Sequence, residues 1–297
     1  MSASPTVGTL WRQWRDLLAA AGMDNAQIDA KLLVGWVLNL SALNLATRER
    51  EPVAPEDVAR VGAVMERRLA GEPVGRIMGE REFYGLVFRL NRATLEPRAD
   101  TELLVDLALG LLPVNGTILD LGTGTGCIPI AVLHTRPDAR GTAIDLSPEA
   151  LEAARGNAER HGVAERLDLL QGSWFEPLAA ANQNGRGKFD LVVSNPPYIE
   201  TAELAKLSRE VREHDPVLAL DGGHDGLTPY PILAAGAQDW LKPGGNLLLE
   251  IGSTQGEAVA QILRSAGYVD VAVHKDLAGL DRVVSGHHLG DKPSTAL

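Results

Sequence analysis

The sequence predicts an α/β protein with a seven-stranded, mostly parallel sheet, preceded by a small helical bundle and a β-hairpin linker. Three observations support this fold class. From Thr117 onward, short apolar runs alternate with helical segments. The first of these runs leads directly into a glycine-rich turn, and a later run ends abruptly at Pro196 and Pro197. Before residue 70, by contrast, apolar residues recur at helical spacing with no strand pattern between them.

The first 70 residues are predicted to form the helical bundle. Their apolar side chains repeat with a period near 3.6, in stripes that begin at Leu10, Ile28 and Val58. Gly22 ends the first stripe, and Pro52 precedes the third. We therefore expect a domain over residues 1–70 that consists of packed helices.

Three further regions complete the predicted organisation. A change to glycine, proline and charged residues, followed by an alternating run from Leu86 to Leu90, indicates a hairpin linker over 71–96. The α/β domain is predicted over 97–289. The polar end of the chain, 290–297, is predicted to be a disordered tail.

Composition limits the possible classes of protein. No apolar run reaches the ~20 residues that a membrane span requires. The single cysteine, Cys127, excludes an internal disulfide and fits a reducing cytoplasm. A net charge of −11 without a basic cluster argues against a protein that binds duplex phosphates. We expect a cytoplasmic monomer without a metal, a membrane partner or a direct nucleic-acid partner.

Seven strands are expected in the main domain, each bounded by turn residues or by a helical segment. About forty residues separate the fourth strand from the fifth, and connections of that length are often functional segments such as lids. The strands are predicted over 117–121, 142–145, 167–170, 189–194, 246–251, 269–273 and 282–285.

A glycine-rich turn, Gly122 to Gly126, follows the first predicted strand. Glycines let backbone N–H groups and a helix N-terminus approach a carboxylate or phosphate closely. The turn is not a dinucleotide fingerprint, because Cys127 stands where G-x-G-x-x-G requires its last glycine.

The next two strands end at side chains that could contact a nucleoside. Asp145 follows the glycine turn by about twenty residues, and a carboxylate there can accept both hydroxyls of a ribose or can cap the turn before the next helix. Trp174 follows the third strand and could pack on an adenine or close the core.

The segment Asn195-Pro196-Pro197-Tyr198 ends the fourth strand, because neither proline can donate a ladder hydrogen bond. The Asn195 amide offers one carbonyl acceptor, a proline carbonyl offers a second, and Tyr198 offers a flat face. Such a corner suits a planar group that carries an NH₂: adenine, cytosine, or a glutamine or asparagine amide. The alternative is an ordinary turn with Tyr198 packed at its rim.

The loop at the start of the main domain contains Arg98 together with Asp100 and Glu102. It could line a cleft or could be a solvated linker, and the residues alone do not separate these interpretations.

The order of these features resembles the class I S-adenosylmethionine-dependent methyltransferases. Within them, the chain is similar to the HemK/PrmC family, the glutamine-N5 methyltransferases of peptide-chain release factors. The similarity extends over roughly residues 15 to 286 and depends on many short blocks in one order. These blocks are Gly71-Glu72-Pro73, 79–85, Pro97-Arg98, Thr101-Glu102, 120–126, 195–198, Gly222-Gly223, 225–227, 241–245, Glu250-Ile251-Gly252 and Asp281-Arg282-Val283.

The resemblance implies S-adenosyl-L-methionine as cofactor and assigns roles to residues at both ends of the site. It implies that the methionine end is held by Asp120, Leu121, Gly122, Thr123 and Gly124, the ribose by Asp145 and the adenine side by Trp174. It implies that Asn195 contacts cofactor and substrate, that Asn195, Pro196 and Tyr198 are catalytic, and that Pro197 and Arg98 also bind substrate.

The implied activity is methyl transfer to the side-chain amide nitrogen of the glutamine in the Gly-Gly-Gln motif of release factors, which supports translation termination. The helical domain would then recognise this protein substrate. The alternative is an adenine-N6 nucleic-acid methyltransferase, which the negative charge disfavours. Departures from the family pattern occur at Glu96, Ala99, Ser173 and His214, and none falls within 195–198.

Overall fold

The computed structural model describes residues 4–182 and 187–290, apart from the side chains of 180–182. Of the predicted tail over 290–297, all but Gly290 lies outside these residues. None of the helices in the described ranges is both long and apolar enough to cross a membrane. Contacts between residues divide the chain into two compact units, the first ending at Glu80 and the second beginning at Arg81.

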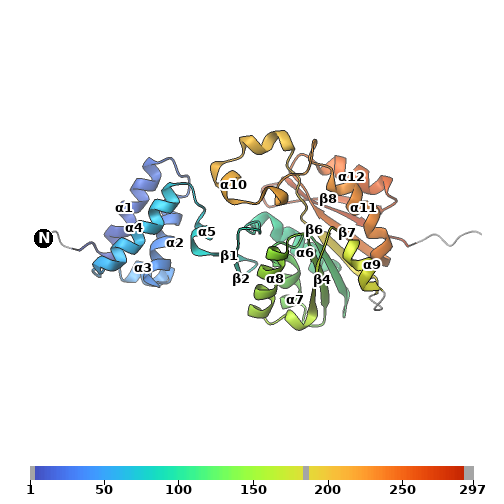
Figure 1. Ribbon diagram of the computed structural model, residues 1–297, viewed down its shortest axis with the longest axis horizontal. Coiled ribbons are helices and arrows are strands. Elements are labelled where there is room, and N and C mark those ends of the chain that lie inside the picture. Colours follow the sequence, from blue (N-terminus) through green and yellow to red (C-terminus); the bar gives the residue numbers. More distant parts are fainter. Residues whose placement is uncertain (1–3, 183–186, 291–297) are drawn as a thin grey trace, which may run out of the picture. The chain divides into compact units, whose positions relative to one another are not determined.

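The described part of the first unit contains five helices, and its last residue, Glu80, begins strand β1 (Figure 1). Its core contains the fully buried Leu18, Leu33 and Met65, and a buried ion pair joins Arg68 Nε to Asp29 Oδ2 at 2.7 Å. Its helices are α1 (Val7–Ala20), α2 (Ala26–Leu38), α3 (Ala42–Thr47), α4 (Pro55–Leu69) and α5 (Val74–Met78). The domain limits predicted from sequence, with a boundary at 70, remain a prediction.

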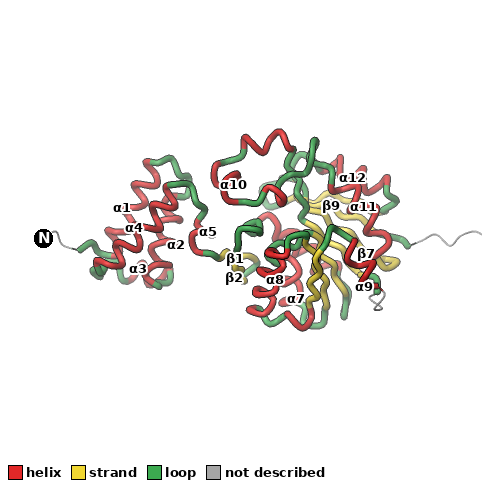
Figure 2. Tube along the Cα trace, in the orientation of Figure 1, coloured by secondary structure: helices red, strands yellow, loops and turns green. Residues whose placement is uncertain are grey.

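The second unit contains the predicted seven-stranded sheet, which confirms the fold class (Figure 2). Its order is β5-β4-β3-β6-β7-β9-β8, and only the pairs β7–β9 and β8–β9 are antiparallel. The strands are β3 (Thr117–Leu121), β4 (Arg140–Asp145), β5 (Leu167–Gln171), β6 (Phe189–Ser194), β7 (Leu241–Glu250), β8 (Val269–Lys275) and β9 (Asp281–His287).

The start of β7 differs from the prediction, which placed it at Asn246. Leu241 already pairs with Phe189, and the next regular pair is Asn246 with Leu191. The residues between Leu241 and Asn246 therefore form an irregularity in the strand, where Pro243 cannot donate a ladder hydrogen bond.

Helices cover both faces of the sheet, as a mostly parallel sheet requires. On one face lie α6 (Glu102–Leu111), α7 (Cys127–Thr135) and α8 (Pro148–Arg160), which share a core with the inward side chains of β3 and β6. On the other lie α9 (Glu176–Asn182), α11 (Pro229–Trp240) and α12 (Gly256–Ser265). They share a second core that contains the fully buried Tyr230 of α11.

The predicted hairpin is formed by β1 (Glu80–Phe83) and β2 (Leu86–Arg89). It packs on the second unit: Tyr84 Oη donates to Asp106 Oδ1 at 2.7 Å, and Arg89 N donates to Asn157 Oδ1 at 2.8 Å. Phe83 and Phe88 are buried in the core on the α6–α8 side. Most of the predicted linker is thus part of the α/β unit.

The chain order creates a reversal between β3 and β6. It runs outward through β4 and β5, then returns to place β6 on the other side of β3. In open α/β sheets, ligands bind at the carboxyl ends of strands beside such a reversal. The glycine turn, Asp145, Trp174 and Asn195 all lie at these strand ends.

Candidate active site

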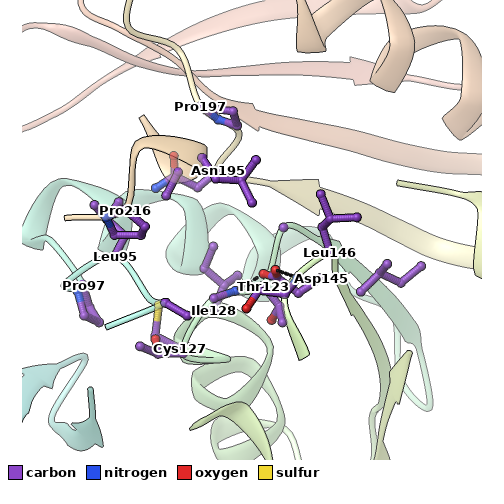
Figure 3. Close-up of a pocket in the computed structure, with 18 of the residues that line it drawn as sticks. Leu95, Pro97, Thr123, Cys127, Ile128, Asp145, Leu146, Asn195, Pro197 and Pro216 are labelled. Carbon is purple, nitrogen blue, oxygen red and sulfur yellow. Dashed lines mark hydrogen bonds between the residues drawn. The ribbon is translucent and has the colours of Figure 1, made fainter. Parts of the chain in front are cut away.

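A cavity of about 340 Å³ lies at the carboxyl ends of β3, β4, β5 and β6. Its volume falls within the usual range for small-molecule sites, roughly 300–1,000 Å³. Figure 3 shows Asn195 and Pro197 bordering it on one side, and Cys127 and Ile128 on another. Most of the wall is apolar: Ala93, Leu95, Pro97, Cys127, Ile128, Ile144, Leu146, Trp174, Pro197, Pro216, Leu218 and Ala219.

The glycine turn follows the carboxyl end of β3 and forms one wall of the cavity. Gly122 and Gly124 have φ values of +75° and +55°, which side chains with a Cβ rarely adopt. A Cβ added at Gly124 would meet no atom within 4 Å, so that glycine leaves open space. The same turn leads into α7, whose first residues Cys127 and Ile128 line the cavity. A helix N-terminus presents unpaired N–H groups and favours a negatively charged group.

Asp145 lies at the end of β4 and faces the cavity. Its Oδ2 accepts from Gly124 N at 2.7 Å, and its Oδ1 accepts from Ser147 N at 3.0 Å. Burial raises the pKa of Asp145, and the backbone donors oppose that rise. Each carboxylate oxygen has a second lone pair. The turn interpretation is therefore correct for the Ser147 contact, and the carboxylate keeps acceptor capacity for a pair of hydroxyls.

Trp174 and Ser173 follow β5 and line the cavity. Trp174 has an unusual φ of +45°. Its ring lies beside the glycine turn, since Cζ3 is 3.8 Å from the position of a Cβ built on Gly122. An aromatic face beside a glycine turn can stack against a planar base.

Asp120 and Leu121, predicted as cofactor residues, are fully buried and do not line the cavity. Neither carboxylate oxygen of Asp120 has a hydrogen-bond partner of acceptable geometry in the described part of the chain. Burial raises the pKa of Asp120 to about 7; the nearby Thr123 hydroxyl opposes this and the Asp145 charge adds to it. Gly122, Thr123 and Gly124 do line the cavity. Of the five residues predicted over 120–124, the last three therefore border the cavity and the first two do not.

The Asn195 amide is held from one side. Its Nδ2 donates to Thr101 Oγ1 at 3.3 Å, and both residues line the cavity. No donor within 4–182 or 187–290 reaches Asn195 Oδ1 or the Pro196 carbonyl oxygen. Asn195 lines the cavity, so its Oδ1 is available to a ligand, and the carbonyl oxygen of the next residue, Pro196, also has no partner among the described residues.

Glycines and a glutamine fix the backbone around Tyr198. A Cβ at Gly222 would lie only 2.8 Å from Tyr198 Cα, so this close approach requires glycine. Gln255 Nε2 donates to the carbonyl oxygens of Tyr198 and Gly226 at 3.0 and 3.1 Å. Pro196 is buried, and neither it nor Tyr198 belongs to the cavity wall. Burial raises the pKa of Tyr198 to about 12.

Arg98, a predicted substrate residue, lines the cavity and contacts the long connection after β6. Its Nη2 lies 3.2 Å from Asp215 Oδ2. Asp215 follows α10 (Arg209–His214), and the next residues Pro216, Leu218 and Ala219 complete the wall. The loop with Arg98 and the long connection thus both border the cavity.

Thr101 and Glu250 were not predicted as site residues. Both are buried, with 3% and 2% exposure, and Thr101 Oγ1 accepts from Asn195 Nδ2 at 3.3 Å. Burial raises the pKa of Glu250 to about 7, and the nearby Thr101 hydroxyl opposes this rise. They occur in sequence blocks shared with the family, but no local pattern indicated a role for either side chain. Sheet order brings them to Asn195 across 94 and 55 residues of sequence.

The groups that line the cavity fit a nucleoside with a charged amino-acid tail. Asp145 offers acceptors for a ribose, Trp174 offers an aromatic face, and the glycine turn offers open space beside a helix N-terminus.

Comparisons with known proteins agree with this geometry. Residues 113–292 match a family model described as a methyltransferase domain, and residues 9–79 match one described as the PrmC N-terminal domain. A methyltransferase structure from Pyrococcus furiosus has a TM-score of 0.51 at 18% identity, covering 77% of this chain and 100% of that one. Fold and site thus define a methyltransferase.

Two curated relatives are similar over nearly the whole chain. The release factor glutamine methyltransferase of Cereibacter sphaeroides is 48% identical over 268 residues, which cover 90% of this chain and 93% of the relative. That of Agrobacterium fabrum is 44% identical over 277 residues, covering 91% and 93%. The chain belongs to the release factor glutamine methyltransferase family.

Proposed function

We propose that this protein transfers a methyl group from S-adenosyl-L-methionine to the side-chain amide nitrogen of the glutamine in the Gly-Gly-Gln motif of peptide-chain release factors. The observation that supports it most is the pair of free acceptors, Asn195 Oδ1 and the Pro196 carbonyl, beside a cavity suited to a nucleoside. A primary carboxamide has two N–H bonds, which such a pair can accept.

Residues 120–124, Asp145 and Trp174 would hold the cofactor, which supplies an electrophilic methyl carbon attached to a sulfonium. Asp120 and Leu121 would act from beneath the wall, because they support the turn without lining the cavity. Asp145 would accept the ribose hydroxyls, and Trp174 would pack near the adenine. Methyl transfer would form the N–C bond and break the S–C bond, leaving the sulfur as a neutral thioether, and the amide nitrogen would then lose one proton.

The amide nitrogen is a weak nucleophile, because its lone pair is delocalised into the carbonyl. Asn195 Oδ1 and the Pro196 carbonyl would fix its two N–H bonds and direct the nitrogen toward the methyl carbon. They would also stabilise the positive charge that develops on nitrogen, by ~3 kcal/mol for each well-placed partner. Tyr198 would support this corner through its backbone, which Gln255 and Gly222 hold.

Arg98, Pro197 and the apolar rim around Leu218 would contact the protein substrate. The helical unit would supply further recognition of the release factor. We place the reaction in the cytoplasm, as the composition favours, and propose a monomer as the active form.

An adenine-N6 nucleic-acid methyltransferase is the alternative, since an exocyclic amine fits the same two acceptors. The net charge of −11 disfavours it, because such enzymes must bind phosphates while extracting a base.

The test is incubation of the protein with methyl-labelled S-adenosylmethionine and either a purified release factor or double-stranded DNA. The proposal predicts one added methyl group on the Gly-Gly-Gln glutamine, located by mass spectrometry of the digested factor. A release factor whose motif glutamine is replaced by alanine is the matched control and should remain unlabelled. Label in DNA alone, or in neither substrate, would refute the proposal.

A further inference from the structure

We propose that Asn157 is a positioning residue that holds the glycine turn in its cofactor-binding form and couples that turn to the hairpin; this rests on the proposed role of the turn as a cofactor site. The supporting feature is one side-chain amide of α8 that bonds two separate segments. Asn157 Oδ1 accepts from Arg89 N at 2.8 Å, and its Nδ2 donates to Arg89 O at 3.1 Å and to Thr125 O at 2.9 Å.

The partners of the Asn157 amide determine its orientation. A backbone N–H can only donate and a backbone carbonyl can only accept, so one orientation of the amide satisfies all three bonds. Both hydrogens of Nδ2 are used, and the side chain is fully buried, with 0% exposure. Asn157 therefore pairs with Arg89 as a neighbouring strand would, and its remaining hydrogen holds the carbonyl of Thr125.

The turn needs such a contact because of the residues on either side of Thr125. Gly124 and Gly126 have φ values of +55° and +78°, and glycine adopts many other backbone conformations at little cost. The α8 helix meets the turn at a second point, since a Cβ added at Gly126 would lie 3.2 Å from Ala154 Cβ. Thr125 lines the cavity and Asn157 does not, so Asn157 can affect a ligand only through the residues that it holds.

The same amide also fastens the chain that leads to another wall of the cavity. Arg89 is the last residue of β2, and most of the segment 93–98 that follows it lines the cavity. Asn91 Nδ2 donates to Glu149 O at 2.6 Å, which attaches this segment to the first turn of α8. The glycine turn and the segment 93–98 are thus both anchored on α8, and Asn157 bonds the chain at both places.

Two consequences follow from this arrangement. Removing the amide would leave the carbonyl of Thr125 and both backbone groups of Arg89 without this partner, and the turn would gain conformations that do not fit the ligand. The coupling must also act in reverse: if the attachment to Asn157 favours ligand binding, ligand binding must strengthen the attachment by the same factor. The hairpin contributes no residue to the cavity wall, yet it should become better protected when the cavity is filled.

The first measurement is the affinity for S-adenosylhomocysteine, by calorimetry. Asn157→Ala removes the amide, and Asn157→Leu fills its space without a hydrogen-bonding group. We expect both to weaken binding by roughly 10- to 100-fold, while kcat at saturating cofactor changes by less than about threefold. Val163→Ala is the control: it is buried in the same core and lies outside the cavity wall, so it should lower the melting temperature and retain the affinity. Wild-type affinity in Asn157→Leu would show that the residue only fills space and would overturn the inference.

The second measurement is amide hydrogen exchange, by mass spectrometry of peptides that contain Arg89, and in the wild-type protein it requires no variant. Saturating S-adenosylhomocysteine should slow exchange in these peptides, because Arg89 N donates to Asn157. The same ligand concentration relative to its dissociation constant should have no such effect in Asn157→Ala or Asn157→Leu. Absence of slowing in the wild-type protein, or equal slowing in the variants, would contradict the coupling.

The outcomes separate this inference from the proposed function. If the wild-type protein binds S-adenosylhomocysteine but methylates DNA instead of the release factor, the proposed function fails, yet the loss of affinity in the Asn157 variants should persist. If the wild-type protein methylates the release factor and Asn157→Ala binds S-adenosylhomocysteine as tightly, the proposed function holds and the inference fails. An equal loss of affinity in Val163→Ala would also overturn the inference, because general loss of stability would then explain both variants.

Discussion

The two halves of the cavity are built in different ways. On the cofactor side, Asp145 bonds Gly124 and Ser147, so its partners lie in its own turn and at the end of the neighbouring strand. On the amide side, Asn195 Nδ2 donates to the hydroxyl oxygen of Thr101, a residue far from it in the sequence. The first half uses backbone N–H groups as donors, whereas the second uses side chains whose orientation is not fixed by the chain itself.

This difference predicts whether a substitution in each half should affect mainly cofactor binding or mainly turnover. Backbone donors stay in place when a nearby side chain is changed, so changes on the cofactor side should mainly reduce binding. A hydrogen bond between two side chains is lost when either side chain is replaced. Changes on the amide side should therefore reduce turnover more than binding.

The largest effect is expected for Asn195→Ala, which removes an acceptor on the reacting nitrogen. Turnover should fall by about 10²- to 10³-fold, while affinity for S-adenosylhomocysteine changes little. Single-turnover methyl transfer and calorimetry measure the two quantities. Asn246→Ala is the control, because that side chain contacts His287 and lies away from the cavity. Equal loss of binding and turnover in Asn195→Ala would remove the distinction between the halves.

Asp120→Asn should change stability rather than binding directly. The folded-state pKa of about 7 lies above the ordinary value of 3.8, so the unfolded chain holds fewer protons between these values. The free energy of unfolding should decrease as pH rises from about 4 to 7, and Asp120→Asn should remove this contribution, by up to a few kcal/mol. Urea midpoints at pH 5 and pH 8 test this. At pH 8 the variant should be more stable relative to the wild-type protein than at pH 5. Asp239→Asn, at an exposed residue of α11, should show no such difference.

Asp145→Ala should weaken cofactor binding by roughly 10- to 100-fold, since it removes acceptors for two hydroxyls and a contact with Gly124 N. Turnover at saturating cofactor should fall less than in Asn195→Ala. Calorimetry with S-adenosylhomocysteine measures the affinity, and Asp239→Ala is the exposed control. If Asp145→Ala lowered only kcat and left the affinity for S-adenosylhomocysteine unchanged, Asp145 would not belong to the cofactor half of the cavity.

The smallest effect is expected at Trp174. Replacing it with alanine should reduce cofactor affinity by about three- to tenfold through loss of the aromatic face, and Trp174→Phe should retain most of the affinity. Competition binding with adenosine measures this contribution separately from the methionine end. An unchanged adenosine affinity in Trp174→Ala would show that the ring serves only the core.

Much of the fold could be predicted because its signals are local. The strand at 117–121 was placed correctly from an apolar run bounded by Gly116 and Gly122, and β6 from its termination at two prolines. The start of β7 was missed, because pairing with Phe189 extends it across a turn sequence. Register between strands depends on a partner that the local sequence does not contain.

The candidate site divides in the same way. Asp145, Trp174 and Asn195 were predicted from their strand ends, and Thr123 and Gly124 from the glycine turn and the family resemblance; all five line the cavity. Asp120 and Leu121 share the motif but point into the core, since side chains alternate along a strand and both faces of this sheet are buried.

By itself, the sequence determined the alternation of strands and helices, the glycine turn and the proline-ended corner with its two acceptors, because each depends on backbone properties of neighbouring residues. Only the tertiary structure brought Thr101, from the loop before α6, to Asn195. It also brought Glu250 beside Asn195, since the order of strands in the sheet places the ends of β6 and β7 side by side. The direction of a side-chain hydrogen bond is set by partners in space, and therefore it could be read only after the chain was folded.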